Sequence, residues 1–174
     1  MKDRDPEYYK AHYADEWAKH KNDVDELEET LLNKFPLLKN CIKRGFGTDT
    51  VKYLEMKPIQ KAEPSLKLNK GFDPFFCIWV SGSDKLTPKD VWIRPDKVER
   101  AVMENNEKND CWFYMKYPKA RFVFKLSDVL PYRENVAEKN LKGPEESFVV
   151  VPASISRSED EMFDAINRQL HPSS

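Results

Sequence analysis

The longest regular pattern in the chain lies between Pro6 and Phe35, where apolar and aromatic residues recur every three or four positions. This spacing places them on one face of a helix, and the pattern stops at Pro36. Pro6 suits the first turn of a helix. The sequence therefore predicts one or two helices in the N-terminal segment 1–36, with a stripe made of Tyr9, Tyr13, Trp17, His20, Val24, Leu27 and Leu31.

The remainder of the chain alternates between patterns typical of strands and of helices. Short apolar runs bounded by Gly, Pro and Ser predict strands at 51–56, 75–80, 91–93, 111–117, 121–126 and 148–151. Asp96 with Glu99, and Ser158 with Glu161, each have the spacing of a helix capping box. We therefore expect an α/β or α+β fold, in one domain over 1–174. A central mixed sheet over 49–151 would be flanked by helices, the last at 158–170.

Composition excludes several classes of protein. The chain has 174 residues, a formal net charge of -1 and no apolar run near the roughly 20 residues that a membrane span needs. Its N-terminus lacks the apolar core of a secretion signal. Cys41, Cys77 and Cys111 stand apart without metal-binding spacing, which argues against a disulfide framework or a zinc site. These features favour a cytoplasmic protein with no membrane partner.

Charge is distributed unevenly along the chain. Residues 1–30 carry ten acidic and five basic side chains, and residues 127–174 carry nine acidic and five basic ones. Between them, residues 39–70 carry eight basic and three acidic side chains. Such a basic stretch favours contact with a phosphate backbone, although a lysine-rich solvated face is the more common origin of a charge run.

The expected strand at 51–56 continues into the most distinctive chemical pattern of the chain. Because side chains alternate along a strand, Glu55 and Lys57 lie on one face, and Asp49 has the same parity. Two carboxylates can hold a hard cation such as Mg²⁺, and a nearby lysine can orient water and stabilise charge on a phosphate. A solvated strand face with ordinary alternating charges is the competing interpretation of the same residues.

A helix glutamate, then an aspartate, then Glu-x-Lys on a strand resembles the PD-(D/E)XK nuclease superfamily, in particular archaeal Holliday-junction-resolvase-like nucleases. The helix and two strands expected after Asp90 have a similar order. The resemblance implies a restriction-endonuclease-like fold, with Asp49 and Glu55 as ligands of Mg²⁺ or Mn²⁺ and Lys57 as the catalytic lysine. Glu28 would be the helix glutamate and a further candidate ligand. Lys97, at the start of the later helix, would contact phosphate.

Two features depart from that family. Only five residues separate Asp49 from Glu55, which leaves no room for the usual hairpin between them. The stretch 59–89 looks like an insertion between the motif and the later helix, and its Asp73 is a further candidate metal ligand.

The sequence thus predicts a metal-dependent nuclease that hydrolyses phosphodiester bonds of nucleic acid, with DNA favoured over RNA. Asp49, Glu55 and Lys57 would be its catalytic residues. Lys52, Lys61 and Lys97 would contact the nucleic acid, and a homodimer is an arrangement that such nucleases often adopt. The alternative is a non-catalytic binding, adaptor or inhibitor protein that uses its acidic helices.

Overall fold

The computed structural model describes residues 6–45, 62–83, 87–139 and 146–172. Helix α1 (Pro6–Lys34) comes first and is followed by a short 3-10 helix at Pro36–Leu38 and by strand β1 (Ile42–Arg44). Strands β2 (Leu66–Lys70) and β3 (Asp73–Gly82) form a hairpin. No helix of the described residues is long and apolar enough to cross a bilayer.

The second half of the chain completes the fold. Strand β4 (Asp90–Ile93) leads into helix α4 (Pro95–Glu104), and β5 (Asp110–Tyr117) and β6 (Ala120–Lys125) form a hairpin. Helix α5 (Leu126–Val129) and a 3-10 helix at Leu130–Tyr132 precede β7 (Val136–Lys139) and β8 (Glu146–Pro152). A 3-10 helix at Ala153–Ile155 and helix α6 (Glu159–Leu170) end the described chain.

The strands form two sheets. The larger has five strands in the order β1-β2-β3-β5-β6 and is mixed, because β3 and β5 run parallel while the other pairs are antiparallel. The smaller has the order β4-β8-β7. The expected mixed α/β fold is therefore confirmed, and the division into two sheets was not contained in the sequence pattern.

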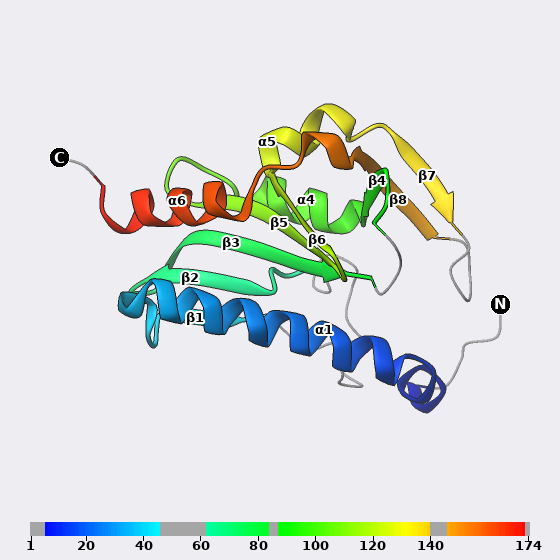
Figure 1. The fold of residues 1–174 in the computed structure, drawn as a ribbon, viewed down its shortest axis with the longest axis horizontal. Helices are drawn as coiled ribbons and strands as arrows, with labels where there is room; N and C mark the ends of the chain where they lie inside the picture. The colour runs from blue at the N-terminus through cyan, green and yellow to red at the C-terminus, as the bar shows by residue number, and fades with distance from the viewer. Residues whose placement is uncertain (1–5, 46–61, 84–86, 140–145, 173–174) are drawn as a thin grey trace.

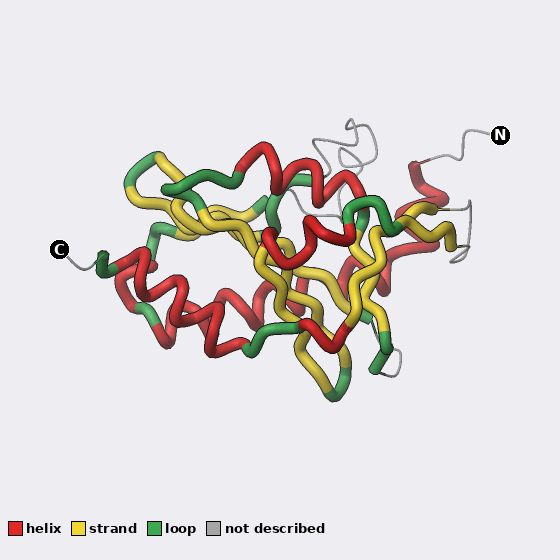
Figure 2. The backbone as a smooth tube through the Cα atoms, turned by 90° about the horizontal axis from the view of Figure 1, so that it is seen from above, coloured by secondary structure: helices red, strands yellow, loops and turns green. Residues whose placement is uncertain are grey.

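Three layers enclose two cores. Helices α1 and α6 cover one face of the five-stranded sheet, whereas α4, α5 and the small sheet lie against the other (Figures 1 and 2). Phe76, Ile78 and Val80 of β3 belong to the first core, and Cys77 and Trp79 belong to the second. A strand that is buried on both faces needs a continuous apolar run, which explains the composition of β3.

Three expectations about individual elements can be compared with the structure. The helix expected to be capped by Asp96 begins at Pro95 with Arg94 as its N-cap, because the fixed φ of a proline suits the first helical position. The stretch 59–89, which the sequence suggests is an insertion, contains β3, and β3 lies at the centre of the larger sheet. The capping box of Ser158 and Glu161 is confirmed: the Glu161 N–H donates to Ser158 Oγ over 3.2 Å.

Candidate functional site at the carboxyl edge

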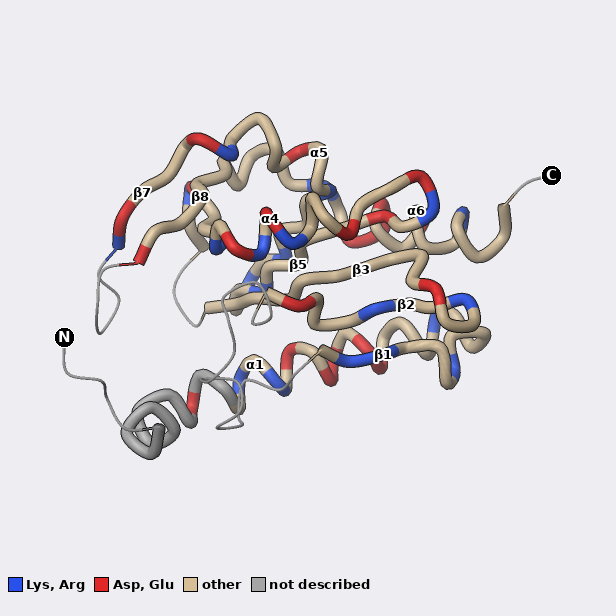
Figure 3. The backbone as a smooth tube through the Cα atoms, turned by 180° about the vertical axis from the view of Figure 1, so that it is seen from behind, with Lys and Arg blue, Asp and Glu red and all other residues tan. Residues whose placement is uncertain are grey.

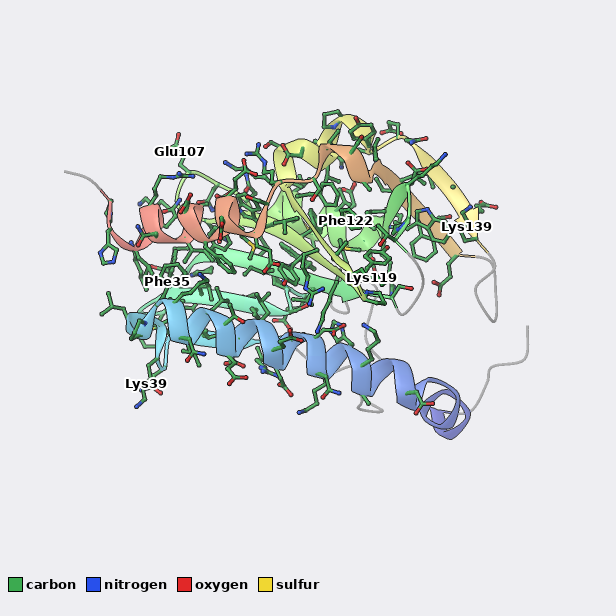
Figure 4. All side chains as sticks on the ribbon, in the orientation of Figure 1. Phe35, Lys39, Glu107, Lys119, Phe122 and Lys139 are labelled. Atoms are coloured by element: carbon green, nitrogen blue, oxygen red, sulfur yellow. The ribbon has the colours of Figure 1, made fainter. Side chains whose placement is uncertain are left out.

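The parallel strands β3 and β5 end side by side, with Gly82 paired to Lys116. Ligands of sheets with parallel strands commonly bind beyond the carboxyl ends of those strands. Figure 4 shows Lys119, in the β5–β6 turn, at this end of the sheet, and shows Phe35 and Lys39 at the opposite end. We call this end the carboxyl edge. Its polar residues are Lys19, His20, Asp23 and Glu26 of α1, Ser81 and Gly82 of β3, Lys97 of α4 and Lys116 of β5.

Asp23 is the centre of one half of the carboxyl edge. It is a buried carboxylate with 5% of its surface exposed. Lys19 Nζ donates to Asp23 Oδ2 over 2.7 Å, and Lys116 Nζ lies 3.2 Å from Asp23 Oδ1. Lys116 also pairs with Glu26, and these carboxylates raise the pKa of the Lys116 ammonium. A buried charge is tolerated when such partners compensate it, so this half is an ion-pair network.

Gly82 allows this network to approach the strand. A Cβ at this position would lie 2.6 Å from the carbonyl oxygen of Lys116 and 2.8 Å from Asp23 Oδ2. Both distances are shorter than carbon and oxygen tolerate without a shift of the strand or of the carboxylate. The glycine at the end of β3 is therefore required by space, and we call Asp23, Lys19, Lys116, Glu26 and Gly82 the locked half.

Lys97 and Ser81 form the other half, together with His20. Lys97 Nζ donates to Ser81 Oγ over 3.0 Å, and the lysine is half-buried. Desolvation, with the nearby charge of Arg94, lowers the pKa of Lys97 to about 8. Desolvation, with the charge of Lys97, lowers the pKa of His20 to about 4, so this imidazole is neutral at pH 7. We call these three residues the open half.

The residues expected as catalytic from the sequence lie in 46–61. Asp49, Lys52, Glu55, Lys57 and Lys61 are all outside the described residues. The residues that flank this segment, Gly45 and Ala62, are described, and both lie at the carboxyl edge. The Gly45 N–H donates to the Ser65 carbonyl over 3.2 Å, and Trp79 Nε1 donates to the Ala62 carbonyl over 2.6 Å.

The remaining candidates do not come together. Glu28 accepts hydrogen bonds from the Arg44 guanidinium, and Asp73 is exposed at the start of β3, about 30 Å along the strand from Gly82. In Figure 3, basic segments of β1 lie beside acidic segments of α1, where Arg44 pairs with Asp25 and Glu28. The basic stretch at 39–70 is thus partly neutralised by the acidic helix. Within the described ranges no group of three or more His, Cys, Asp or Glu side chains could hold a metal ion.

Sequence reasoning missed Asp23, Ser81 and Lys116 as members of a site. Asp23 and Lys116 are far apart in the chain, and nothing local connects them. The local signal at Gly82 is a glycine between two serines after an apolar run. From the sequence alone, this pattern indicates a turn. His20 was assigned to the helix stripe, and its half-buried position agrees with that assignment.

The chain is similar in structure to Hjc of Archaeoglobus fulgidus, a Holliday junction resolvase from an archaeal hyperthermophile. The match has 14% sequence identity and a TM-score of 0.44, and it covers 83% of this chain and 94% of that one. No known family model matches the sequence, and no curated protein matches it. This likeness is a distant one in fold alone, and it assigns no chemistry to this chain.

Proposed function

We propose that this protein is a metal-dependent nuclease that hydrolyses phosphodiester bonds of DNA at the carboxyl edge. Asp49 and Glu55 would be the ligands of Mg²⁺ or Mn²⁺, and Lys57 would orient the attacking water. The observation that carries the proposal is that Gly45 and Ala62, the residues that flank 46–61, are hydrogen-bonded beside the end of β3.

The attachment is specific on both sides. Arg44 pairs with Leu66 in the β1–β2 ladder, and Gly45 follows directly, packed against Pro64 so closely that a Cβ would lie 2.3 Å from the Pro64 carbonyl oxygen. On the other side the Val80 N–H donates to Ser65 Oγ over 3.0 Å. The residues on either side of the segment that carries Glu55 and Lys57 therefore lie next to the last residues of β3.

Positive charge at this edge supports a polyanionic substrate. Lys97 is half-buried and binds a neutral hydroxyl, so its charge is available to a phosphate. Lys52 and Lys61, in the attached segment, would add phosphate contacts along the strand of nucleic acid. Glu28 and Asp73 are left out of the proposed metal site, because one is bound to Arg44 and the other lies at the opposite end of β3.

The described residues do not themselves form a site for a divalent cation. Asp23 and Glu26, the carboxylates of α1 at the carboxyl edge, are bound to lysines. The proposal therefore assigns the metal to Asp49 and Glu55, whose carboxylate oxygens are the ligand type that Mg²⁺ and Mn²⁺ prefer.

A cleavage assay tests the proposal. Single-stranded, double-stranded and branched DNA, and RNA, are incubated with Mg²⁺, with Mn²⁺ or with EDTA. We expect metal-dependent cleavage by the wild type and a loss of at least about 100-fold in Glu55→Gln and Lys57→Met, as is typical when a group that stabilises the transition state is removed. Glu107→Gln removes an exposed carboxylate between α4 and β5, and it should leave the rate unchanged.

Two results would overturn the proposal. One is a folded wild type that cleaves no substrate and gains no thermal stability from Mn²⁺, which would instead identify a non-catalytic binding protein. The other is cleavage that Glu55→Gln leaves intact.

A further inference from the structure

Lys97 is held in place by its own helix. Val98 and Ala101 of α4 are fully buried in the second core, so the first turn of the helix is fixed against the sheet. Lys97 lies beside Val98 in that turn, and its side chain reaches the end of β3, where Nζ meets Ser81 Oγ at 3.0 Å. The ammonium is therefore positioned by packed elements.

The electrostatic surroundings of this ammonium differ from those of four other half-buried cations. Lys19, Lys67, Arg100 and Lys116 each pair with a carboxylate within 3.6 Å. Across the part of the chain that the structure describes, Lys97 forms no ion pair, and its side-chain partner is the neutral hydroxyl of Ser81.

The charged groups around Lys97 come from two elements. Arg94 and Asp96 lie on α4 itself, and Arg94 disfavours the protonated amine while Asp96 favours it. His20 of α1 feels the charge of Lys97 and is neutral at pH 7, with Lys19 next to it in the chain. Burial outweighs Asp96, which is why the pKa of Lys97 falls to about 8 rather than rising as that of Lys116 does.

We propose that Lys97 is a catalytic residue of the nuclease, the general acid that protonates the leaving oxygen of the phosphodiester. This role rests on the proposed function. The oxygen of water forms a new bond to phosphorus and releases a proton to solvent. The bond from phosphorus to the leaving oxygen breaks, and its electron pair takes the proton from Lys97 Nζ. The neutral amine then regains a proton from solvent.

Geometry favours Lys97 over Lys116 for this role. A general acid has to release its proton during the reaction, and a pKa near the working pH makes that release efficient. Two carboxylates hold the proton of Lys116, whereas the partner of Lys97 is one hydroxyl oxygen. The bond to Ser81 Oγ shows that Lys97 Nζ can donate its proton to a neutral oxygen at this edge.

Leaving-group substitution tests this role. A DNA substrate is compared with the same sequence carrying sulfur at the bridging position where the wild type cleaves, because a thiolate leaves without needing a proton. We expect Lys97→Met to lose at least about 100-fold on the oxygen substrate. On the sulfur substrate it should stay within about threefold of the wild type. Lys108→Met removes an exposed lysine before β5 and should match the wild type on both.

The pH profile supplies a second readout. With the oxygen substrate the wild-type rate should fall as pH rises through about 8, where Lys97 loses its proton, and the sulfur substrate should lack this decline. Lys97→Arg keeps the positive charge but has a guanidinium that does not release its proton, so it should bind the substrate and cleave the oxygen form slowly.

The failure of this inference is distinguishable from failure of the proposed function. If the wild type cleaves and Glu55→Gln abolishes cleavage, but Lys97→Met slows both substrates equally or neither, Lys97 is not the general acid. If the wild type cleaves neither substrate, the nuclease itself is refuted, and the role of Lys97 with it. Circular dichroism of Lys97→Met confirms that the variant is folded before the rates are compared.

Discussion

Two lysines at the carboxyl edge of one sheet have opposite electrostatic surroundings. Lys116, at the end of β5, contacts Asp23 and Glu26, and its pKa is raised. Lys97, reaching the end of β3 from α4, contacts a hydroxyl, and its pKa is lowered to about 8. The locked half of the edge is thus compensated within the protein, and among the described residues the open half has no carboxylate partner.

The difference shows how one edge can combine stability with chemistry. A lysine that is paired with a buried carboxylate stabilises the fold and keeps its proton. A desolvated lysine without such a partner costs stability, and its charge and proton remain available to a ligand. The locked half fixes α1 against the sheet, and we expect the open half to meet the substrate.

The largest effect should come from Gly82→Ala in the locked half. Its new Cβ would meet the backbone of Lys116 and the Asp23 carboxylate, so we expect unfolding by urea to show a loss of about 3 kcal/mol. Gly71→Asn is the matched control: Gly71 has a φ of 62° with nothing within 4 Å of an added Cβ, and asparagine tolerates that φ. Equal losses in both variants would contradict the close packing at Gly82.

Lys116→Met should have the next largest effect on stability. It leaves the buried Asp23 with Lys19 as its remaining cationic partner, and we expect a loss of about 2 kcal/mol in the free energy of unfolding. Lys108→Met removes an exposed lysine and should change stability by less than about 0.5 kcal/mol. A Lys116→Met protein as stable as the control would show that the network contributes nothing.

The pH dependence of stability should reveal the lowered pKa of His20. Its pKa of about 4 in the folded protein lies below the ordinary histidine value of 6.5, so the unfolded chain binds more protons between these pH values. Stability should therefore fall by about 1 to 2 kcal/mol as pH drops from 6.5 to 4. The His20→Gln variant should show a smaller fall over the same interval, and an identical acid dependence would contradict the neutral, desolvated imidazole.

Lys97→Met should have the smallest effect, with the opposite sign to Lys116→Met. It removes a desolvated charge, so at pH 7 the variant should equal or exceed the wild type in stability by up to about 1 kcal/mol. Because the folded pKa of about 8 lies below 10.5, wild-type stability rises between these pH values and the advantage of the variant disappears. Destabilisation comparable to that of Lys116→Met would place Lys97 in a compensated network instead.

The sequence predicted the elements whose signals are local. The stripe of α1, the capping box of α6 and the apolar runs of β3 and β5 correspond to elements of the structure. The short edge strands β1 and β7 escaped prediction, because three or four residues on a half-exposed edge carry no clear alternation. The start of α4 was misplaced because Pro95 begins the helix before the aspartate that resembled a cap.

The site was predicted less completely, for a physical reason. Lys97 was named as a phosphate contact, and its partner Ser81 lies on another element. The Asp23–Lys116 pair joins a helix to a strand more than 90 positions away, and pairing at that range leaves no periodic trace. Asp49, Glu55 and Lys57 stay a prediction, since they lie outside the described residues.

The division of the carboxyl edge is tested most directly by titrating Lys97 and Lys116 in one sample. The lysine Hε–Cε NMR signals of the isotope-labelled protein are followed from pH 6 to 12. The signal that disappears in Lys97→Met is assigned to Lys97, and the one that disappears in Lys116→Met is assigned to Lys116. We predict that Lys97 titrates near 8 and that Lys116 titrates above the ordinary lysine value of 10.5. Two lysines that both titrate near 10.5 would contradict the account.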